Sequence, residues 1–454
     1  MIFQRIRHQR RFLLVALGLS LVAGSSVWRI TTASTPAVQP LIAPLPQDPY
    51  LQVFFNHSEA SVYSEPYRQI DRLGDDLEQA VITAIEQATT SVDIAVQALN
   101  LPLVAQALVD SHRRGVSVRL VLENQYAHPA THPVPTLTPA EDAHREPGNA
   151  LDLLWRAQVP LLDDTADGSK GSGLMHHKFL VIDGRWVLTG SANLTFSGIH
   201  GDAENPESRG NANVLLKIDS PAIAAYFTQE FDLMWGDGPA ARPDSRFGLQ
   251  KPSRPTQAVS LPTGSITLQF SPHSASKPWP QSVNGLISQT LAQSTRSIDL
   301  ALFVFSEQRI ANQLENRVKA GAALRALIDP GFAYRSYSEA LDMLGMSLRD
   351  QRCRIEPDNR PWLNPIDSVG SPRLPVGDKL HHKFAVIDRA TVIVGSQNWS
   401  HAANTENDEA LLVIRNPTVA AHFSREFERL YRNPMVGKTL LLERKAEESR
   451  QRCP

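Results

Sequence analysis

Short apolar runs alternate with helical stripes through the first half of the chain. Residues 91–99 (SVDIAVQAL) and 116–123 are predicted to be buried strands, and Leu51–Phe55 an edge strand. Residues 77–89 and 102–114 carry apolar side chains at helical spacing, and a proline stands in the first turn of the second stripe. This order of strands and helices predicts a largely parallel sheet flanked by helices.

The second half repeats this order with similar residues. Residues 297–305 (SIDLALFVF) match residues 91–99, so that Asp299 takes the place of Asp93, 206 positions earlier. The predicted strands align while the loops differ in length, as expected of a duplicated scaffold. Buried acids are usually paired, so Asp93 and Asp299 are expected to be structural, bonded to backbone or sheet-end donors.

Segments without this periodicity divide the chain. Residues 29–49 and 236–262 are rich in proline and small residues and are predicted to be linkers. They bound a first domain at 50–235 and a second at 263–436. Residues 437–454 are predicted to be a charged tail that forms a frayed helix.

A proline-rich segment without periodicity, residues 127–150, interrupts the first domain. Loops of this length in compact domains are usually functional or disordered, so this segment is predicted to form a flap near the site. Its histidines, His128, His132 and His144, match no metal-ligand spacing and are expected to be solvated.

The N-terminus has the pattern of an export signal. Residues 1–11 contain four arginines and no acid, residues 12–23 are almost wholly apolar, and small residues follow. The uncharged run 12–28 is near the lower length limit for a membrane span. Residues 1–28 are therefore predicted to be a cleaved signal peptide or a membrane anchor. Either places the rest of the chain outside the cytoplasm, as a secreted, periplasmic or outward-facing anchored protein.

The composition bears on which ligands the protein is expected to bind. The chain has 45 Lys and Arg against 47 Asp and Glu, so no global basic field favours nucleic acid, although a local basic cleft remains open. The two cysteines, Cys353 and Cys453, lack metal-ligand spacing, and no metal or other cofactor is predicted. A disulfide between them stays open, although the charged surroundings of Cys453 argue against it.

One motif occurs twice with unchanged spacing: H-x-K, then D, then G-S-x-N. All its members recur 205 residues later: His176, Lys178, Asp183, Ser191 and Asn193 in the first copy, and His381, Lys383, Asp388, Ser396 and Asn398 in the second. Alternate residues of a strand share a face, so each copy presents an imidazole and an ammonium together. Two imidazoles, two cations and two amides suit a phosphodiester, because the cations and amides hold its oxygens while the imidazoles attack phosphorus or move protons.

The paired motif resembles the HKD signature of the phospholipase D superfamily. The resemblance implies two similar α-β-α sandwich domains of the α/β class, related by a pseudo-twofold axis, with the active site at their interface. It implies a metal-independent reaction through a phosphohistidine, and a monomer is expected because both motifs lie in one chain. In this interpretation the phosphate contacts Asn193, Asn398, Ser191 and Ser396, while Asp183 and Asp388 belong to the catalytic motif and mainly hold its fold.

The two halves differ after the motif. Relatives often carry a carboxylate there that orients the histidine of the other half, and this chain has Glu409 in the second half but Asn213 in the first. Glu204 or Glu207 is a candidate to replace the missing acid. Glu409 is expected to orient His176, which makes His176 the nucleophile and His381 the general acid.

The leading functional hypothesis is hydrolysis of phospholipid head groups, with possible membrane association. An endonuclease of the same superfamily, acting on DNA or RNA, and a phosphatidyl transferase such as a cardiolipin synthase are the alternatives. A degenerate binding module is disfavoured because both motifs are complete.

Overall fold

The computed structural model describes residues 38–127, 150–169, 173–202, 205, 207–239 and 242–453. The predicted export signal, the first part of the 29–49 linker, and the flap with its three histidines lie outside these residues. Within the described part of the chain, no helix has both the length and the apolar character needed to cross a membrane.

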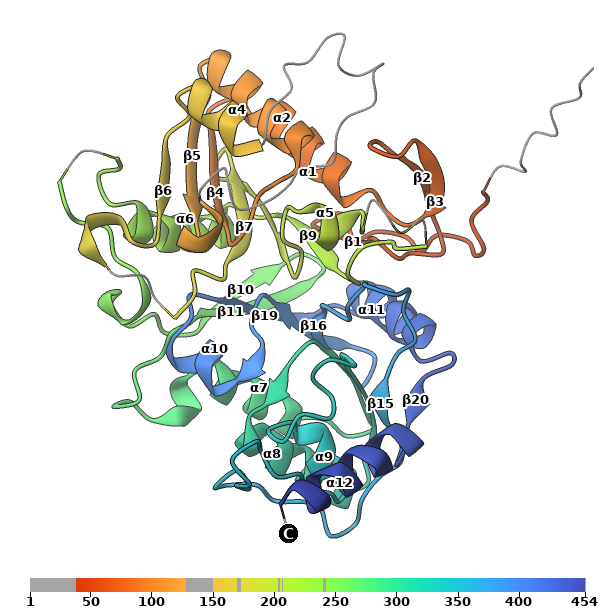
Figure 1. Ribbon diagram of the computed structural model, residues 1–454. Coiled ribbons are helices and arrows are strands. Elements are labelled where there is room, and N and C mark those ends of the chain that lie inside the picture. Colours follow the sequence, from red (N-terminus) through yellow and green to blue (C-terminus); the bar gives the residue numbers. More distant parts are fainter. Residues whose placement is uncertain are drawn as a thin grey trace, which may run out of the picture. The chain divides into compact units, whose positions relative to one another are not determined.

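The first half is built on a seven-stranded mixed sheet (Figure 1). The pairs β4–β5 and β5–β6 are parallel, and the other neighbours are antiparallel. The expectation of a largely parallel sheet is therefore wrong, because the motif folds as a hairpin, β7–β8, that reverses direction beside β4. The strand order is β1 (Leu51–Phe55), β9 (Val214–Asp219), β8 (Trp186–Gly190), β7 (Lys178–Ile182), β4 (Ser91–Val96), β5 (Ser117–Leu122) and β6 (Leu161–Asp163).

Helices cover both faces of this sheet. One face packs its apolar side chains against α1, α2 and α4, and the other against α6. A separate hairpin, β2–β3, and three short helical elements complete the described part of the half. The bounds are α1 (Leu77–Glu86), α2 (Pro102–Arg113), α4 (Ala150–Arg156), α5 (Phe196–Ile199), α6 (Pro221–Trp235), β2 (Val62–Glu65), β3 (Ile70–Leu73) and the 3-10 turns Asn124–Tyr126 and Ala166–Gly168.

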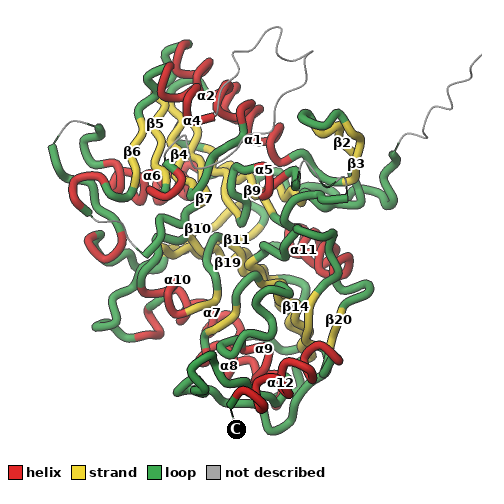
Figure 2. The backbone as a smooth tube through the Cα atoms, in the orientation of Figure 1, coloured by secondary structure: helices red, strands yellow, loops and turns green. Residues whose placement is uncertain are grey.

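The second half repeats this plan around a nine-stranded sheet. The order is β10 (Gln257–Leu261), β11 (Gly264–Phe270), β19 (Ala410–Arg415), β17 (Thr391–Gly395), β16 (Lys383–Ile387), β12 (Ser297–Leu302), β14 (Ala323–Ile328), β15 (Val369–Ser371) and β20 (Met435–Val436). A small parallel pair joins β13 (Phe305–Ser306) to β18 (Trp399–Ser400). The helices are α7 (Val283–Ala292), α8 (Gln308–Lys319), α9 (Glu339–Met343), α10 (His401–Thr405), α11 (Pro417–Leu430) and α12 (Leu440–Arg452), and Figure 2 shows α8, α9 and α12 grouped at one end.

The acids in the central strands have partners on the neighbouring parallel strand. Asp93 on β4 accepts two hydrogen bonds from Arg119 on β5, at 2.7 and 2.8 Å. Asp299 on β12 accepts two from Arg325 on β14, at 2.8 and 3.0 Å. Both acids are structural, as expected, but the donors are guanidinium groups rather than backbone or sheet-end groups.

The segments predicted as a linker and as a charged, frayed helical tail belong to the second half's fold. The 236–262 linker contains the edge strand β10, and its Lys251 is fully buried between Glu230 and Asp408, at 2.5 and 2.7 Å. The tail forms α12, which packs Leu442 into the second half's core. An amphipathic helix is held by its apolar face, and its charged residues lie on the opposite side.

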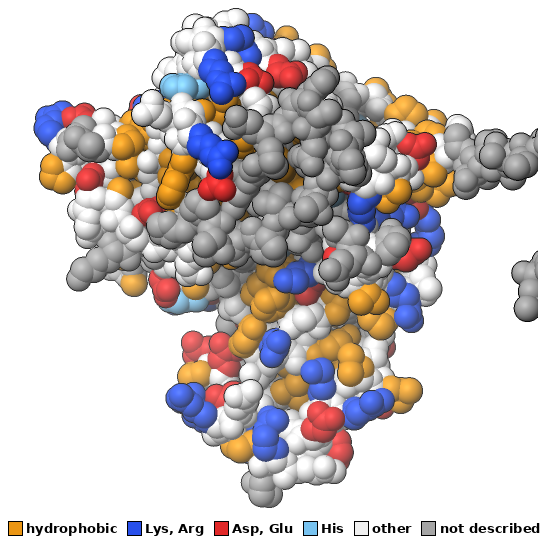
Figure 3. Space-filling model, turned by 45° about the horizontal axis from the view of Figure 1, so that its top comes forward, with side chains coloured by type: hydrophobic (Ala, Val, Ile, Leu, Met, Phe, Trp, Pro, Cys, Tyr) orange, Lys and Arg blue, Asp and Glu red, His pale blue; other side chains and the backbone are white. Residues whose placement is uncertain are grey.

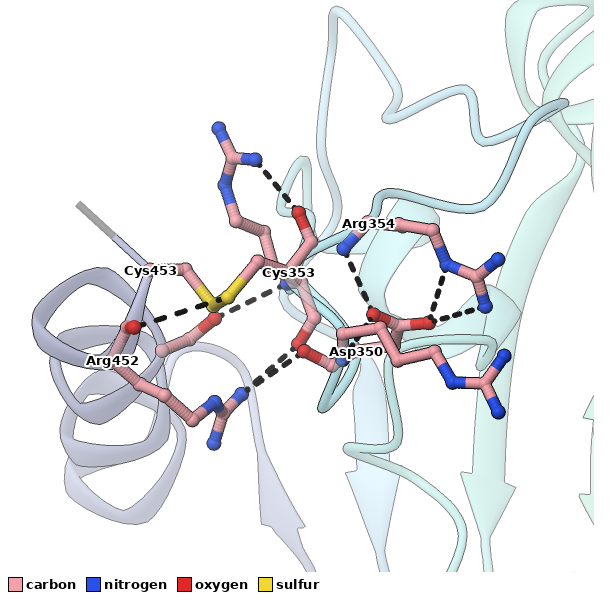
Figure 4. Close-up of a disulfide and its surroundings, with 8 residues drawn as sticks. Asp350, Cys353, Arg354, Arg452 and Cys453 are labelled. Carbon is pink, nitrogen blue, oxygen red and sulfur yellow. Dashed lines mark hydrogen bonds and ion pairs between the residues drawn. A yellow bond between two sulfur atoms is a disulfide. The ribbon is translucent and has the colours of Figure 1, made fainter.

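The chain also contains a disulfide that the sequence argued against. Cys353 and Cys453 are bridged, although 100 residues separate them (Figure 4). The packing of α12 brings Cys453 to the loop that holds Cys353, and the Arg452 guanidinium donates to the backbone oxygen of Arg349 at 3.2 Å. The charges around Cys453 therefore dock the helix end instead of keeping it in solvent.

The two halves share one hydrophobic core. Phe227 of α6 in the first half packs edge to face on Phe270 of β11 in the second, with ring centroids 5.1 Å apart. Phe423 of α11 packs in the same way on Phe55 of β1, at 5.2 Å. The long helix of each half is therefore covered by a strand of the other half, α6 by β11 and α11 by the edge strand β1, which fixes how the two motifs face each other.

Candidate active site

The motif histidines stand where the two halves exchange backbone hydrogen bonds. The amide of His176 donates to the carbonyl of Asp408 at 3.0 Å, just before β19. The amide of His381 donates to the carbonyl of Ala212 at 3.1 Å, just before β9. Each imidazole thus lies beside the start of a strand of the opposite half, and both are buried.

Those strand starts supply one partner to each imidazole. The Nδ1–H of His176 donates to Glu409 Oε2 at 2.7 Å, and that of His381 donates to Asn213 Oδ1 at 2.9 Å. The predicted pairing of Glu409 with His176 is confirmed as a contact. Burial lowers the pKa of both imidazoles well below its usual value, and the nearby lysine ammoniums lower it further.

Asn213, and not a displaced acid, occupies the place of the missing carboxylate. Its Nδ2 donates to the carbonyl of Gly198 at 2.7 Å, which turns its Oδ1 toward His381. Glu207 is exposed and takes no part in the site, so its candidacy is wrong, and Glu204 lies outside the described residues. The sequence shows that Asn213 stands where the other half has Glu409, but it does not show that Asn213 contacts His381 directly.

The lysines are buried next to the histidines that precede them. Lys178 Nζ donates to the carbonyl of His176 at 2.9 Å, and Lys383 Nζ donates to that of His381 at 2.8 Å. Burial lowers the pKa of Lys178 to about 7 and lowers the pKa of Lys383 well below its usual value. An anionic substrate would raise both values, because it stabilises the charged ammonium.

The motif asparagines are partly exposed. Asn193 Nδ2 donates to Gln97 Oε1 at 3.3 Å. Within the described part of the chain, Oδ1 of Asn193 and Oδ1 of Asn398 are buried without a hydrogen-bond partner. Contact of these two amides with a substrate phosphate stays a prediction.

The motif serines are fully buried and hold the histidine partners. Ser191 Oγ donates to Asn213 Oδ1 at 2.7 Å, and Ser396 Oγ accepts from the amide of Ala410 at 3.0 Å and hydrogen-bonds Glu409. Their predicted role as phosphate ligands is therefore wrong. The register of each motif hairpin with the next strand turns the hydroxyl inward.

The glycine before each serine permits this close strand approach. A Cβ on Gly190 would lie 2.2 Å from the Val214 carbonyl oxygen, and one on Gly395 would lie 2.1 Å from that of Ala410. No side chain fits at these distances, which explains the G-S pair in both motifs.

Asp183 and Asp388 lie at the opposite end of the motif strand from the histidines. Asp183 accepts backbone hydrogen bonds from Thr90 at 2.7 Å and Ser91 at 2.9 Å, and Asp388 accepts equivalent bonds from Arg296 and Ser297. A five-residue strand, about 17 Å long, separates each from its histidine. They hold the fold of the motif, as expected, and lie too far from the histidines to share the catalytic role also assigned to them.

A second histidine in each motif was missed. His177 and His382 are fully buried, and their Nε2 atoms lie 3.2 Å from Glu230 on α6 and 2.9 Å from Glu426 on α11. The repeated His-His pair was the available signal. These histidines tie each motif strand to the long helix behind it.

Comparison with known proteins agrees with this arrangement. The family described as "Cardiolipin synthase, PLD-like domain" matches residues 81–235 and 287–431, together more than half of the chain. The chain belongs to the phospholipase D superfamily. The predicted fold class, two similar phospholipase D-like α/β domains, is confirmed by this double match and by the repeated sheets.

Curated relatives of this phospholipase D-like chain are similar over one third of it. The "Mitochondrial cardiolipin hydrolase" of Xenopus laevis is 32% identical over 148 residues, which are 33% of this chain and 56% of that protein. The "Phospholipase D" of Rickettsia prowazekii is 26% identical, over 33% of this chain and 59% of that protein. The chain thus spans little more than half the length of either relative.

A solved structure supports the fold over a longer stretch. The phosphatidylserine synthase of Haemophilus influenzae matches with a TM-score of 0.52 at 13% identity, covering 85% of this chain and 88% of that one. At this identity the likeness concerns the fold alone.

Proposed function

We propose that this protein is a phospholipase D-type phosphodiesterase that hydrolyses phospholipid head groups through a phosphohistidine. The observation that carries the proposal is the meeting of two buried imidazoles, one from each half, with different Nδ1 partners. The lipid-related names of the family and of the relatives favour a phospholipid over a nucleic acid. Lys and Arg are also interspersed with acids on the described face in Figure 3, with no broad basic patch.

In the first step, Nε2 of His176 attacks phosphorus. Glu409 accepts the Nδ1–H, which leaves the Nε2 lone pair free and stabilises the positive charge that forms on attack. The bond from phosphorus to the head-group oxygen breaks, and that oxygen takes a proton from Nε2 of His381. Lys178 and Lys383 hold the phosphate oxygens as their charge rises.

In the second step, water attacks the phosphohistidine and gives a proton to Nε2 of His381. The P–N bond breaks, its electron pair returns to His176, and phosphatidic acid leaves. The neutral Asn213 stabilises an imidazolium less than a carboxylate does, so His381 gives up its proton more readily than His176 would. His381 acquires that proton when the phosphodiester anion enters and raises its pKa.

Metal independence is part of the proposal, because two lysines supply the positive charge at the phosphate. The test is an assay of the purified protein, with EDTA present, on four substrates: phosphatidylcholine, phosphatidylglycerol, plasmid DNA and RNA. Release of head group from a phospholipid, lost in His176→Ala, is the expected result. Cleavage of nucleic acid alone, or activity that EDTA abolishes and zinc or calcium restores, would contradict it.

A second candidate is phosphatidyl transfer, in which an alcohol replaces water in the second step. The family description, which names a synthase, favours keeping it in the test. Adding glycerol to the assay and measuring phosphatidylglycerol against phosphatidic acid separates transfer from hydrolysis.

We also propose that the protein acts outside the cytoplasm, as a monomer that contains both motifs and associates with membranes. Its arginine-rich, apolar N-terminus supports export, and so does the disulfide, because disulfides persist mainly in oxidising compartments. An alkaline phosphatase fused to the C-terminus should be active. An inactive fusion beside an active cytoplasmic reporter at the same point would contradict export.

A further inference from the structure

The two sides of the phospholipase D-like site differ in the residue that follows the central strand of each sheet. Gln97 follows β4, and Phe303 stands at the matching position after β12. Gln97 Oε1 accepts from Lys178 Nζ and Asn193 Nδ2, each at 3.3 Å. Phe303 instead packs on the imidazole of His381, with ring centroids 4.8 Å apart. The His176 side is thus polar and the His381 side apolar.

A second ring extends this apolar side. Phe332 meets Phe303 edge to face at a centroid distance of 4.7 Å, and both rings are partly exposed. Aromatic pairs in this arrangement are mutually stabilising and present a fixed apolar surface. The first half has Tyr126 at the position of Phe332, so the difference between the halves arises mainly from Gln97 and Phe303.

The side chain of Lys383 already lies over this surface. Lys383 Nζ is 4.9 Å from the ring centroid of Phe303. Aromatic faces attract cations, but a quaternary ammonium placed here would also meet the charge of Lys383 in a buried, low-dielectric site. An uncharged apolar group gains from the rings without that repulsion.

We infer that Phe303 and Phe332 form a leaving-group wall that selects lipids whose departing alcohol is uncharged and apolar. The inference rests on the proposed function, in which His381 protonates the departing oxygen and the alcohol therefore leaves on the His381 side. Phe303 determines specificity in this scheme and transfers no proton.

Three esters with the same phosphatidyl part test the wall. Their alcohols are 3,3-dimethylbutanol, choline and glycerol; the first two have the same shape and differ by one charge. The 3,3-dimethylbutyl ester is expected to have the highest kcat/KM, by about tenfold, the effect of one or two methylenes in an apolar pocket. A preference for choline over its neutral isostere would overturn the inference.

Variants decide whether Phe303 causes the preference. Phe303→Gln, which copies the first half, is expected to reduce the dimethylbutyl-to-glycerol ratio about five- to tenfold, whereas Phe303→Leu keeps most of it. Gln97→Phe is the matched control and should leave the ratio within about twofold, because it alters the side that keeps the phosphatidyl group. If Phe303→Gln does not fold, as judged by circular dichroism, Phe332→Ala carries the same expectation.

The outcomes separate this inference from the proposed function. Cleavage of none of the three esters by the unaltered protein would overturn both. Cleavage of all three, with ratios that Phe303→Gln leaves unchanged or that Gln97→Phe changes instead, would overturn only the leaving-group wall.

Discussion

The two halves carry the same motif but surround it differently. Each has a buried lysine bonded to the preceding histidine carbonyl, a serine under the next strand and an aspartate at the far strand end. They differ at the groups that touch the imidazoles, which are Glu409 on His176 and Asn213 with Phe303 on His381. The shared residues build the site, and in the proposed mechanism the unshared ones assign a different task to each histidine.

The histidines themselves give the largest expected effect. Replacing either with alanine should reduce kcat by about 10⁴-fold or more, since nucleophile and acid act as one unit. A p-nitrophenyl phosphodiester needs little help to depart, so with it His381→Ala should still form the phosphohistidine and then stall. His176→Ala should form none.

Mass spectrometry of rapidly quenched protein measures this adduct, and the unaltered protein under the same quench is the control. An adduct on His381, or one that persists in His176→Ala, would exchange the roles of the two halves.

The partners of the imidazoles come next. Glu409→Gln should slow adduct formation about 10²- to 10³-fold, because an amide stabilises the imidazolium less than a carboxylate does. Asn213→Ala is the matched variant in the other half and should cost about tenfold, since it removes a neutral acceptor. Quenched-flow rates of adduct formation measure both. Equal losses would mean that the difference between the halves has no catalytic meaning.

The pH profile sharpens the same comparison. Burial raises the pKa of Glu409 to about 7, so its carboxylate is lost as the pH falls through that value. Burial lowers the pKa of Lys178 to about 7, so its ammonium is lost as the pH rises through it. A narrow bell in kcat/KM near neutral pH is expected. In Glu409→Gln, kcat/KM should no longer fall on the acidic side of the bell. If the acidic fall stays in place, a group other than Glu409 causes it.

The disulfide distinguishes the halves in stability. Among the described residues it is the one covalent bridge, and it closes a 100-residue loop in the second half. Replacing both cysteines with serine should lower the free energy of unfolding by about 2–4 kcal/mol. Because the bridge lies outside the motif strands, kcat should change little. Urea unfolding measures the loss, with the reduced unaltered protein as control.

The smallest effect concerns a feature that the halves share. Asp183→Asn and Asp388→Asn should each lower the free energy of unfolding by about 1–3 kcal/mol, because each aspartate accepts several backbone hydrogen bonds. Thermal unfolding measures it. A large fall in kcat with intact stability would return these residues to the catalytic set.

Much of the site could be predicted because the repeat fixes it. Invariant spacing and strand alternation were enough to pair His176 with Lys178 and His381 with Lys383. The resemblance placed Glu409 against the histidine of the other half. The sequence could not predict that the Ser191 hydroxyl points into the protein, because its direction depends on the register of β8 with β9.

The remaining errors also arise from contacts between distant segments. The charged composition near Cys453 gave no sign of the apolar face that docks α12. The parallel sheet was inferred from strand order, whereas the motif hairpin reverses direction beside β4. Local pattern predicts elements, and tertiary packing decides their neighbours.

The reciprocal packing of α6 on β11 and of α11 on β1 has a consequence for motion. Opening the interface like a hinge would expose both phenylalanine pairs, and each buried phenylalanine is worth about 1.5–3 kcal/mol. Rigid-body opening is therefore too rare to admit substrate. Any substrate must therefore reach the buried histidines, and any product leave them, while the two halves stay packed together.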